Sequence, residues 1–551
     1  MSFVYRGNAG FGGLDHRRAA SDGAIYDMRN LSARDLPVLT SRKKRVAVAK
    51  ELSELSCAIY VDRLFYVADG AFFDEGERML ELSADLPKRL CHIQSKILIM
   101  PDGILYDVEK KEAEYVRRRY EGEVQFLRTN LSLHGEDATW LATSLALQDP
   151  DSEDPARKGW EVGQYLHIKA AWSGGSINGN PLPGHEIDKI CKITDQCLAR
   201  NHTDAFDMST YEYVYKLEGI EFSDLGNDLR VTAEAEIYAG IPEMDVVFEH
   251  NNRLWGAKDG EIFCSALGQP DVWFDYDTLS TSAWRVSLAA GDKAVGGCVV
   301  AGMPCFFSEN AIYKVYGDDP TDFSYARSRY LGIKRGEGAS LCAVGERAFY
   351  VSKRGVCAYA GGAPSVISDA LGSEEISHAI GGTDGVRYYL YAAVGEEEPF
   401  LYVFDADKGV WVKEDGLQIA AMYSHDGEAA CLGQNGDILI LSSDKLEGDL
   451  EDKVPWLLET ADYTMGAVIR KSANRLLLRY ELADDGFGTV AISYEGEPPR
   501  ELGKLSPGSK RVEEFALPVI PHDHFKILMW GEGEVAIYAF EVNVKAMAER
   551  K

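Results

Sequence analysis

Three consecutive residues near the C-terminus could hold a metal ion. His522, Asp523 and His524 offer two imidazoles and one carboxylate, which are common zinc ligands. A zinc site usually draws together about four ligands, and nothing in the sequence indicates a further ligand elsewhere along the chain. The sequence therefore favours a surface corner between two strands over a metal site.

A second oxygen-rich cluster lies in the run FDADKGVW, which contains Asp405, Asp407 and Gly409. Its spacing differs from that of a calcium-binding EF-hand loop, and it lacks the terminal Glu of that loop. We therefore interpret this run as a tight turn between two strands.

Four aromatic residues could form a platform on which sugar rings stack: Trp255, Trp273, Tyr276 and Trp284. Flat rings supply a large contact area at a low cost in conformational entropy. Such residues more often pack between the sheets of a repetitive β protein, and the sequence favours this second role.

The chain lacks the common catalytic motifs. It contains no G-x-S-x-G nucleophile elbow, no phosphate loop, no H-E-x-x-H zinc motif and no repeated aspartate box of the sialidase kind. Carboxylates are abundant, but nothing positions two of them as a glycosidase pair. The sequence predicts a protein that is not an enzyme, without catalytic, cofactor-binding or metal-binding residues and without a cofactor.

Two basic clusters stand near the N-terminus, at residues 15–18 (DHRR) and 42–45 (RKKR). A run of basic residues could contact a nucleic acid or an acidic partner. A solvated loop is the favoured interpretation, because the chain as a whole is acidic. The first 50 residues are irregular and could form an extended arm that ties onto a neighbour.

The overall charge argues against a nucleic-acid-binding surface. The 551 residues include 58 basic and 88 acidic side chains, for a formal net charge of −30, whereas nucleic-acid binding depends on neutralising phosphates. The charge suits a soluble protein, a partner rich in cations, or the wall of a channel along which DNA slides without sticking.

The cysteines and the apolar runs indicate where the chain is made. Ten cysteines are scattered without C-x-x-C pairs or zinc spacing, which is typical of small buried side chains in a reducing compartment. The N-terminus does not have the pattern of a signal peptide, and no apolar run is long enough to cross a membrane. We expect synthesis in the cytoplasm and no membrane span.

A repeated hairpin unit organises the chain. Its clearest copy, residues 249–273, has an apolar strand, an Asn-Asn corner, a second strand, an Asp-Gly turn and a third strand. Asp-Gly between apolar runs is a strong hairpin signal, because both residues tolerate φ > 0. Counting this copy, units begin near residues 57, 92, 246, 298, 342, 380 and 421, and the later starts are roughly 40 to 50 residues apart, as in propeller blades.

This pattern predicts an all-β chain: a six- or seven-bladed β-propeller, an inserted β-rich domain and a C-terminal β-sandwich of jelly-roll type. The apolar pattern around residues 187–198 fits a helix or a buried strand, and an acidic, proline-containing loop spans residues 148–155. The expected divisions are an N-terminal arm (1–50), first propeller units (51–108), the insertion (109–242), remaining blades (243–450) and the sandwich (451–551).

Several segments resemble one family. Residues 253–274, 302–320 and 345–368, together with 21–32 and 517–542, resemble the β-propeller structural proteins of tailed bacteriophages. The tail nozzle, or tail tubular protein B, and the "stabilization proteins" of phages and prophages belong to this family.

The resemblance implies a non-enzymatic virion protein at the head-tail junction or tail, made in the bacterial cytoplasm. Its expected partners are portal, adaptor or tail proteins, in a six- or twelve-fold homo-oligomeric ring through which DNA passes without specific binding. A carbohydrate- or host-surface-binding β-propeller is the alternative, and the four aromatic residues are its basis.

Overall fold

The computed structural model describes most of the chain. The residues that it does not describe are 1–3, 9–10, 18–23, 84–86, 130–137, 145–159, 161, 173–175, 178–179, 182–184, 199–211, 221–223, 225–229, 277–278, 444–449, 465–468 and 547–551. The acidic loop at 148–155 therefore lies outside the described residues. The chain divides into two compact units. The first comprises Met1–Glu81, Val295–Lys314 and Ala326–Lys551, and the second comprises Leu82–Ala294 and Val315–Tyr325.

The described residues form an all-β protein, which confirms the predicted class. Apart from strands they contain short 3₁₀ turns, such as η3 (Gly338–Ser340) and η4 (Ser368–Leu371). Among these residues no helix is long and apolar enough to cross a membrane.

Seven four-stranded sheets make up much of the described chain, and their strands follow one another in sequence order with one exception. Four sheets lie wholly in the first unit and two wholly in the second, while the sheet β26 to β29 has β26 and β27 in the first. The four sheets that lie wholly in the first unit consist of β6 (Cys57–Tyr60), β7 (Leu64–Ala68), β8 (Ala71–Asp74) and β9 (Glu77–Glu81); β30 (Cys342–Val344), β31 (Arg347–Ser352), β32 (Gly355–Tyr359) and β33 (Ser365–Val366); β34 (Ile376–Thr383), β35 (Arg387–Val394), β36 (Phe400–Asp405) and β37 (Val410–Lys413); and β38 (Ile419–His425), β39 (Glu428–Gly433), β40 (Ile438–Ile440) and β5 (Val46–Ala49). The two sheets of the second unit consist of β10 (Arg89–Ile93), β11 (Lys96–Met100), β12 (Ile104–Asp107) and β13 (Glu112–Tyr115), and of β22 (Val246–His250), β23 (Arg253–Lys258), β24 (Glu261–Cys264) and β25 (Trp284–Ser287). The remaining sheet consists of β26 (Gly296–Val300), β27 (Met303–Phe307), β28 (Ile312–Tyr316) and β29 (Ser324–Ser328).

The exception is the sheet of β38, β39 and β40, whose fourth strand comes from the other end of the chain. In this sheet β5 pairs with β40, so that Val46 lies opposite Ile440 and Ala47 opposite Leu439. A strand from the N-terminal segment thus completes a sheet built otherwise from residues near 430.

First strands of consecutive sheets pack side by side. In the first unit β26 contacts β30, β30 contacts β34, β34 contacts β38 and β38 contacts β6, while in the second unit β10 contacts β22. The second strand of a sheet is buried over nearly its whole length, as in β31, β35 and β39. A strand covered on both faces is expected to be apolar throughout rather than alternating, which explains why the repeat reads as short continuous apolar runs.

The Asp-Gly corners form the predicted hairpin turns. Asp69 and Gly70 have φ values of 47° and 62°, and Asp259 and Gly260 have 47° and 90°. Left-handed φ at both central residues matches the twist of the flanking strands. These turns place β7 against β8 and β23 against β24.

A closed six-stranded barrel belongs to the second unit. Its strands, in order around the barrel, are β14 (Arg117–Thr129), β15 (Ala138–Ser144), β20 (Glu212–Glu218), β19 (His185–Leu198), β16 (Tyr165–Trp172) and β21 (Arg230–Gly240). Along β21, Val231, Ala233, Ala235, Ile237 and Ala239 are buried at every second position, as in a strand with one face toward the core. The segment around residues 187–198, which the sequence left open between helix and strand, is the strand β19. The short pair β17 (Ser176–Ile177) and β18 (Asn180–Pro181) also lies in this part of the chain.

Strands from both ends of the chain form two further sheets of the first unit. The six-stranded sheet has the order β3 (Leu31–Ser32), β4 (Leu39–Ser41), β47 (Val535–Ala546), β42 (Lys471–Leu482) and β45 (Gly508–Ala516), with β1 (Val4–Asn8) also on β47. The five-stranded sheet has the order β2 (Ile25–Arg29), β41 (Pro455–Thr460), β46 (Phe525–Glu532), β43 (Phe487–Tyr494) and β44 (Arg500–Leu505).

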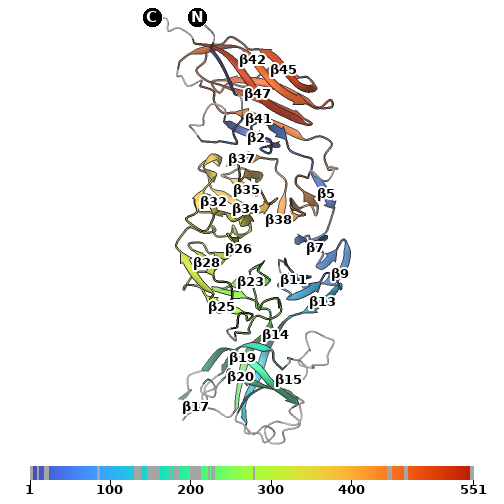
Figure 1. Ribbon diagram of the computed structural model, residues 1–551, viewed down its shortest axis with the longest axis vertical. Helices are drawn as coiled ribbons and strands as arrows, with labels where there is room; N and C mark the ends of the chain where they lie inside the picture. The colour runs from blue at the N-terminus through green and yellow to red at the C-terminus, as the bar shows by residue number, and fades with distance from the viewer. Residues whose placement is uncertain are drawn as a thin grey trace. The chain divides into compact units, whose positions relative to one another are not determined.

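The N-terminal segment is therefore built into the C-terminal sheets. Figure 1 shows the blue strand β2 beside the orange strand β41, with which it pairs. Buried side chains of both sheets, such as Leu478 and Ile527, belong to one core that continues into sheet β34 to β37 through Trp411 and Tyr389. The domain boundaries drawn from the sequence stay predictions.

Candidate functional site

The four aromatic residues named from the sequence have two different environments, all within the second unit. Trp255 on β23 and Trp273 are buried, with 2% and 1% of their surfaces exposed. Tyr276 and Trp284 are half-buried and together line one pocket. Packing accounts for the first two residues, as the sequence favoured, and the other two remain accessible to a ligand.

This pocket has a volume of about 390 Å³ and combines apolar and polar walls. Ile190 of the barrel strand β19 and Pro320 contribute apolar surface, and Trp284, Arg285, Val286 and Ser287 are the residues of β25. Because β25 is the last strand in the order β22-β23-β24-β25, it has no neighbour in its own sheet on one side.

The Arg285 guanidinium is the charged group of the pocket. Its Nη2 lies 2.5 Å from Oε1 of Glu261 and its Nε 3.1 Å from the same oxygen. The Tyr276 hydroxyl is buried and makes no hydrogen bond to any described residue. Burial raises the pKa of this phenol, and the nearby Arg285 opposes the rise, so the hydroxyl stays protonated at neutral pH.

A wide polar groove of about 1440 Å³ lies within the first unit, along β2, β37 and the turns after β31, β33 and β35. Lys413, 4% exposed, lies with its Nζ 3.3 Å from Oδ1 of Asp27 and 3.9 Å from Oε2 of Glu397. The same ammonium lies 4.3 Å from the centre of the Phe400 ring. The sequence did not indicate this group, because Asp27 and Lys413 are 386 positions apart.

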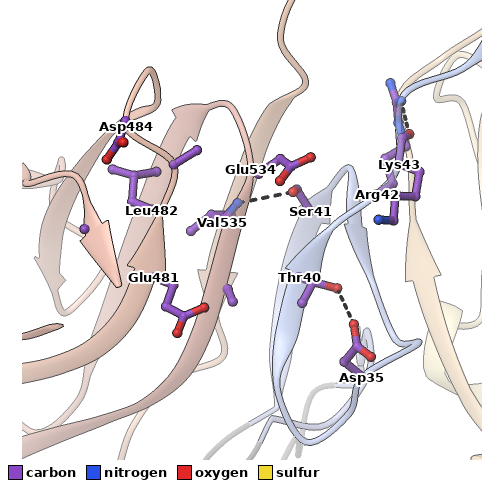
Figure 2. A pocket seen from close by; sticks show the side chains of 13 residues that line it. Asp35, Thr40, Ser41, Arg42, Lys43, Glu481, Leu482, Asp484, Glu534 and Val535 are labelled. Atoms are coloured by element: carbon purple, nitrogen blue, oxygen red, sulfur yellow. Dashed lines mark hydrogen bonds between the residues drawn. The ribbon is translucent and has the colours of Figure 1, made fainter. Parts of the chain in front are cut away.

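A smaller hollow of about 460 Å³ lies where the N-terminal segment meets strands β42 and β47. Figure 2 shows Thr40 and Ser41 on the pale blue N-terminal segment and Glu481 and Val535 on the strands opposite. Thr40 donates a hydrogen bond to Asp35, and the Val535 amide donates one to Ser41 over 3.2 Å. The second of these hydrogen bonds joins the N-terminal segment to β47, which suits a structural role.

The expectation that residues 42–45 form a solvated loop is wrong for both arginines. Arg42 and Arg45 are 3% and 2% exposed. Arg42 donates two hydrogen bonds to the Glu451 carboxylate, over 2.6 and 2.7 Å, and Arg45 lies 2.6 Å from Asp415 and 3.1 Å from Glu414. Buried guanidinium groups require such partners, because an unpaired buried charge is very costly.

Only part of the other basic cluster, at residues 15–18, is described. Asp15 is buried and accepts a hydrogen bond of 2.6 Å from the exposed Arg17, while Arg18 lies outside the described residues. The Arg17 guanidinium lowers the pKa of the Asp15 carboxyl and outweighs the opposing effect of burial.

The expected surface corner at residues 522–524 is also wrong in part, because His522 is fully buried. Its Nδ1 lies 2.7 Å from the carbonyl oxygen of Ile520, and its ring packs against Tyr494 and Phe525. Its Nε2 is buried without a hydrogen-bond partner among the described residues. Burial lowers the pKa of this imidazole.

The other two residues of the triplet do not converge on His522 as ligands. His524 contacts the carboxylate of Asp523 through Nδ1. Within the described residues no group of three or more His, Cys, Asp or Glu side chains has the arrangement of a metal site.

The run that contains Asp405, Asp407 and Gly409 is a turn between β36 and β37, as interpreted from the sequence. The amide of Gly409 donates to the Asp405 carbonyl over 2.8 Å, and the amide of Lys408 donates to the Asp405 carboxylate over 3.0 Å. That carboxylate also faces the Arg387 guanidinium at 3.3 Å. Its oxygens therefore already have partners.

A histidine that the sequence did not single out lies on the barrel strand β16. His167 is 9% exposed and contacts the carboxylate of Asp188 on β19. Burial lowers the pKa of His167 against the opposing effect of Asp188. The pair is 21 positions apart and matches no motif, so only the barrel register reveals it.

Comparisons with known proteins do not assign the chain to a family. No family model matches, and no curated protein matches. Among solved structures, an exo-β-1,3-galactanase from Phanerochaete chrysosporium with galactose has 10% identity and a TM-score of 0.22, covering 55% of this chain and 96% of that chain.

Two other similar structures also come from carbohydrate-related proteins. A glycoside hydrolase family 43 arabinoxylan arabinofuranohydrolase from Bacillus subtilis has 9% identity and a TM-score of 0.16, covering 54% of this chain and 96% of that chain. TmCBM61 in complex with β-1,4-galactotriose has 9% identity and a TM-score of 0.14, covering 32% and 90%. At these TM-scores the similarities carry no argument about fold or function.

Proposed function

We propose that this chain is a non-enzymatic structural protein of a tailed-phage particle. Its four-stranded sheets are the blades of a β-propeller, and its two sheets near the C-terminus form a β-sandwich. The resemblance of residues 253–274, 302–320 and 345–368 to phage β-propeller proteins is the basis for the phage assignment.

One structural observation supports the architecture most strongly, namely the run of first strands in contact from β26 through β30, β34 and β38 to β6. Sheets that meet through their first strands are arranged as consecutive blades. The five four-stranded sheets in this run account for five blades of the six or seven that the sequence repeat predicts.

Strands from the two ends of the chain pair with each other, and this pairing is consistent with a structural protein. β5 closes the sheet of β38 to β40, and β1 to β4 add strands to sheets formed mainly by the last 100 residues. Opening the protein from either end would break these pairings together. A component of a particle that is assembled once and then persists needs such kinetic stability.

In the proposed role the protein forms a six- or twelve-fold ring on portal, adaptor or tail proteins at the head-tail junction or in the tail. The net charge of −30 would keep DNA from adhering to a channel wall as it passes.

The test is mass spectrometry of purified particles from the source of this sequence. We expect the 551-residue chain among the particle proteins, at a copy number comparable with that of the portal. Absence of the chain from intact particles would reject the virion assignment.

A carbohydrate-binding protein is the second candidate, favoured by the pocket in which Tyr276 and Trp284 lie together. The names of the similar solved structures agree with this candidate, but their TM-scores lend it no weight. A binder of host-surface sugars does not require a ring, so glycan binding by a monomeric chain would favour this candidate over the first.

A further inference from the structure

We propose that the pocket beside β25 binds one or two rings of a neutral saccharide, with the Trp284 indole as the stacking platform. This inference rests on the second candidate function and assigns the site for it. The platform, the polar group and the size of the pocket each support it.

Neighbouring rings hold Trp284 in place. Its ring meets Trp255 at 6.1 Å and Phe323 at 5.5 Å between centroids, edge to face in both cases. Trp255 is itself buried, and it packs against Phe323 at 5.2 Å. An aromatic ring already fixed by its surroundings loses little conformational entropy when a ligand stacks on it.

Trp284 also offers a hydrogen-bond donor. Its side chain is half-buried, and its indole N–H makes no hydrogen bond to any described residue. Sugar rings have apolar C–H faces and polar rims, so one indole can stack on the face and donate to a rim hydroxyl. Trp273, whose N–H donates to the Pro270 carbonyl over 2.7 Å, has no free donor of this kind.

Arg285 provides the polar contact and also limits the charge of the ligand. Its guanidinium lines the pocket while two of its nitrogens contact Glu261, which leaves further N–H groups for ligand oxygens. Because Glu261 neutralises this cation and the chain is strongly acidic, the site favours a neutral saccharide over an anionic one.

The size of the pocket limits the ligand to a small molecule or to the end of a larger glycan. Its volume of about 390 Å³ lies near the lower end of the range for small-molecule sites, about 300–1,000 Å³. Apolar surface from Ile190 and Pro320 matches the C–H groups of sugar rings. One or two rings would fill this space.

The full-length chain should first be tested on an array of neutral glycans that includes hexoses, N-acetylhexosamines and their disaccharides. The best glycan is then titrated by calorimetry against the wild type and three variants. We expect Trp284→Ala to weaken binding about tenfold or more, Arg285→Ala to weaken it less, and Trp284→Phe to retain part of the affinity, because a ring remains for stacking.

Trp530→Ala is the matched control, because Trp530 on β46 is a partly exposed tryptophan that belongs to the first unit, whereas the pocket belongs to the second. The Trp530→Ala variant should bind the glycan with the affinity of the wild type. Circular dichroism checks that each variant is folded. Trp284→Ala also removes the packing of Trp284 against Trp255 and Phe323. Arg285→Ala leaves that packing in place and therefore tests the site separately. If Trp284→Ala and Arg285→Ala both bind the glycan as the wild type does, the pocket beside β25 is not the site, although the chain binds carbohydrate elsewhere. If the wild type binds no glycan on the array, both the site and the carbohydrate-binding function are rejected.

Discussion

Arg42 and Arg45 are buried, although the basic run to which they belong predicts a solvated loop. Each guanidinium is nearly inaccessible to solvent and faces carboxylates that lie about 370 to 410 positions further along the chain. Asn30 joins the same cluster, since its side-chain oxygen accepts hydrogen bonds from Arg42 and from the Asp415 amide. The cluster fixes the N-terminal segment to the residues that follow β37 and to Glu451.

Replacing Arg42 by Ala should destabilise the first unit by about 3–5 kcal/mol, because Glu451 and Asp415 would lose a buried partner. Denaturant unfolding measures the change. The exposed neighbour Lys43 provides the control, and Lys43→Ala should change stability by less than about 1 kcal/mol. If both variants lower the free energy of unfolding by the same small amount, the Arg42 cluster contributes little to the stability of the first unit.

The same cluster contributes to acid sensitivity. Burial raises the pKa of Asp415 and of Glu451, but the arginines outweigh it and both values are lowered. A carboxyl whose pKa is lower in the folded state stabilises the fold above its unfolded pKa and loses that contribution as the pH falls through the folded value. The acid-induced loss of stability should therefore be smaller in Arg42→Ala than in the wild type.

His522 should make the first unit less stable as the pH falls from 7 toward 5. Its pKa is lowered by burial, so the unfolded chain takes up a proton at a higher pH than the folded chain does, which favours unfolding. His522→Gln should reduce this pH dependence, as measured by unfolding midpoints at several pH values. An unchanged slope would contradict the assignment of a buried neutral imidazole.

These residues mark the limit of local sequence reasoning. The RKKR run predicts a solvated surface because its partners, Glu414, Asp415 and Glu451, are remote in sequence. His522 is likewise covered by Tyr494, 28 positions earlier. By contrast, the turn at Asp405 was predictable, because its hydrogen bonds are local.

The strand β5 is the element that most changes the organisation of the chain. It carries no hairpin signal, and the sequence placed it in an N-terminal arm. In the fold it pairs with β40, and Val46 packs against Ala430 and Ile440. Pairing over nearly 400 residues depends on the whole fold, whereas the Asp-Gly hairpins depend on neighbouring residues and were therefore predictable.

Two variants in β5 test this pairing, because Val46 pairs with Ile440 in the ladder whereas Val48 falls at the register shift between β5 and β40. Val46 is 8% exposed and Val48 is 36% exposed. Val46→Asp should cost about 3 kcal/mol or more, since it buries an unpaired carboxylate, while Val48→Asp should cost less than about 1 kcal/mol. Unfolding in denaturant measures both, and similar values would contradict the burial of Val46 beneath this sheet.

For the whole molecule, the sequence predicted the strand class and the hairpin repeat but not how the ends combine. The regular spacing of apolar runs and Asp-Gly corners is a local pattern, and it indicated seven candidate units. The number of four-stranded sheets, seven in the described residues, agrees with it. The barrel at β14 to β21 could be expected only as a β-rich insertion, because its closure requires the long-range pairing of β14 with β21.

The central claim is that this chain works as a ring-forming part of a phage particle. Cryo-electron microscopy of particles from the source of the sequence, with symmetry analysis of the head-tail region, tests it most directly. We predict density for the 551-residue chain in a six- or twelve-fold ring around the path of the DNA. Particles whose head-tail and tail density is fully accounted for by other proteins would contradict the claim.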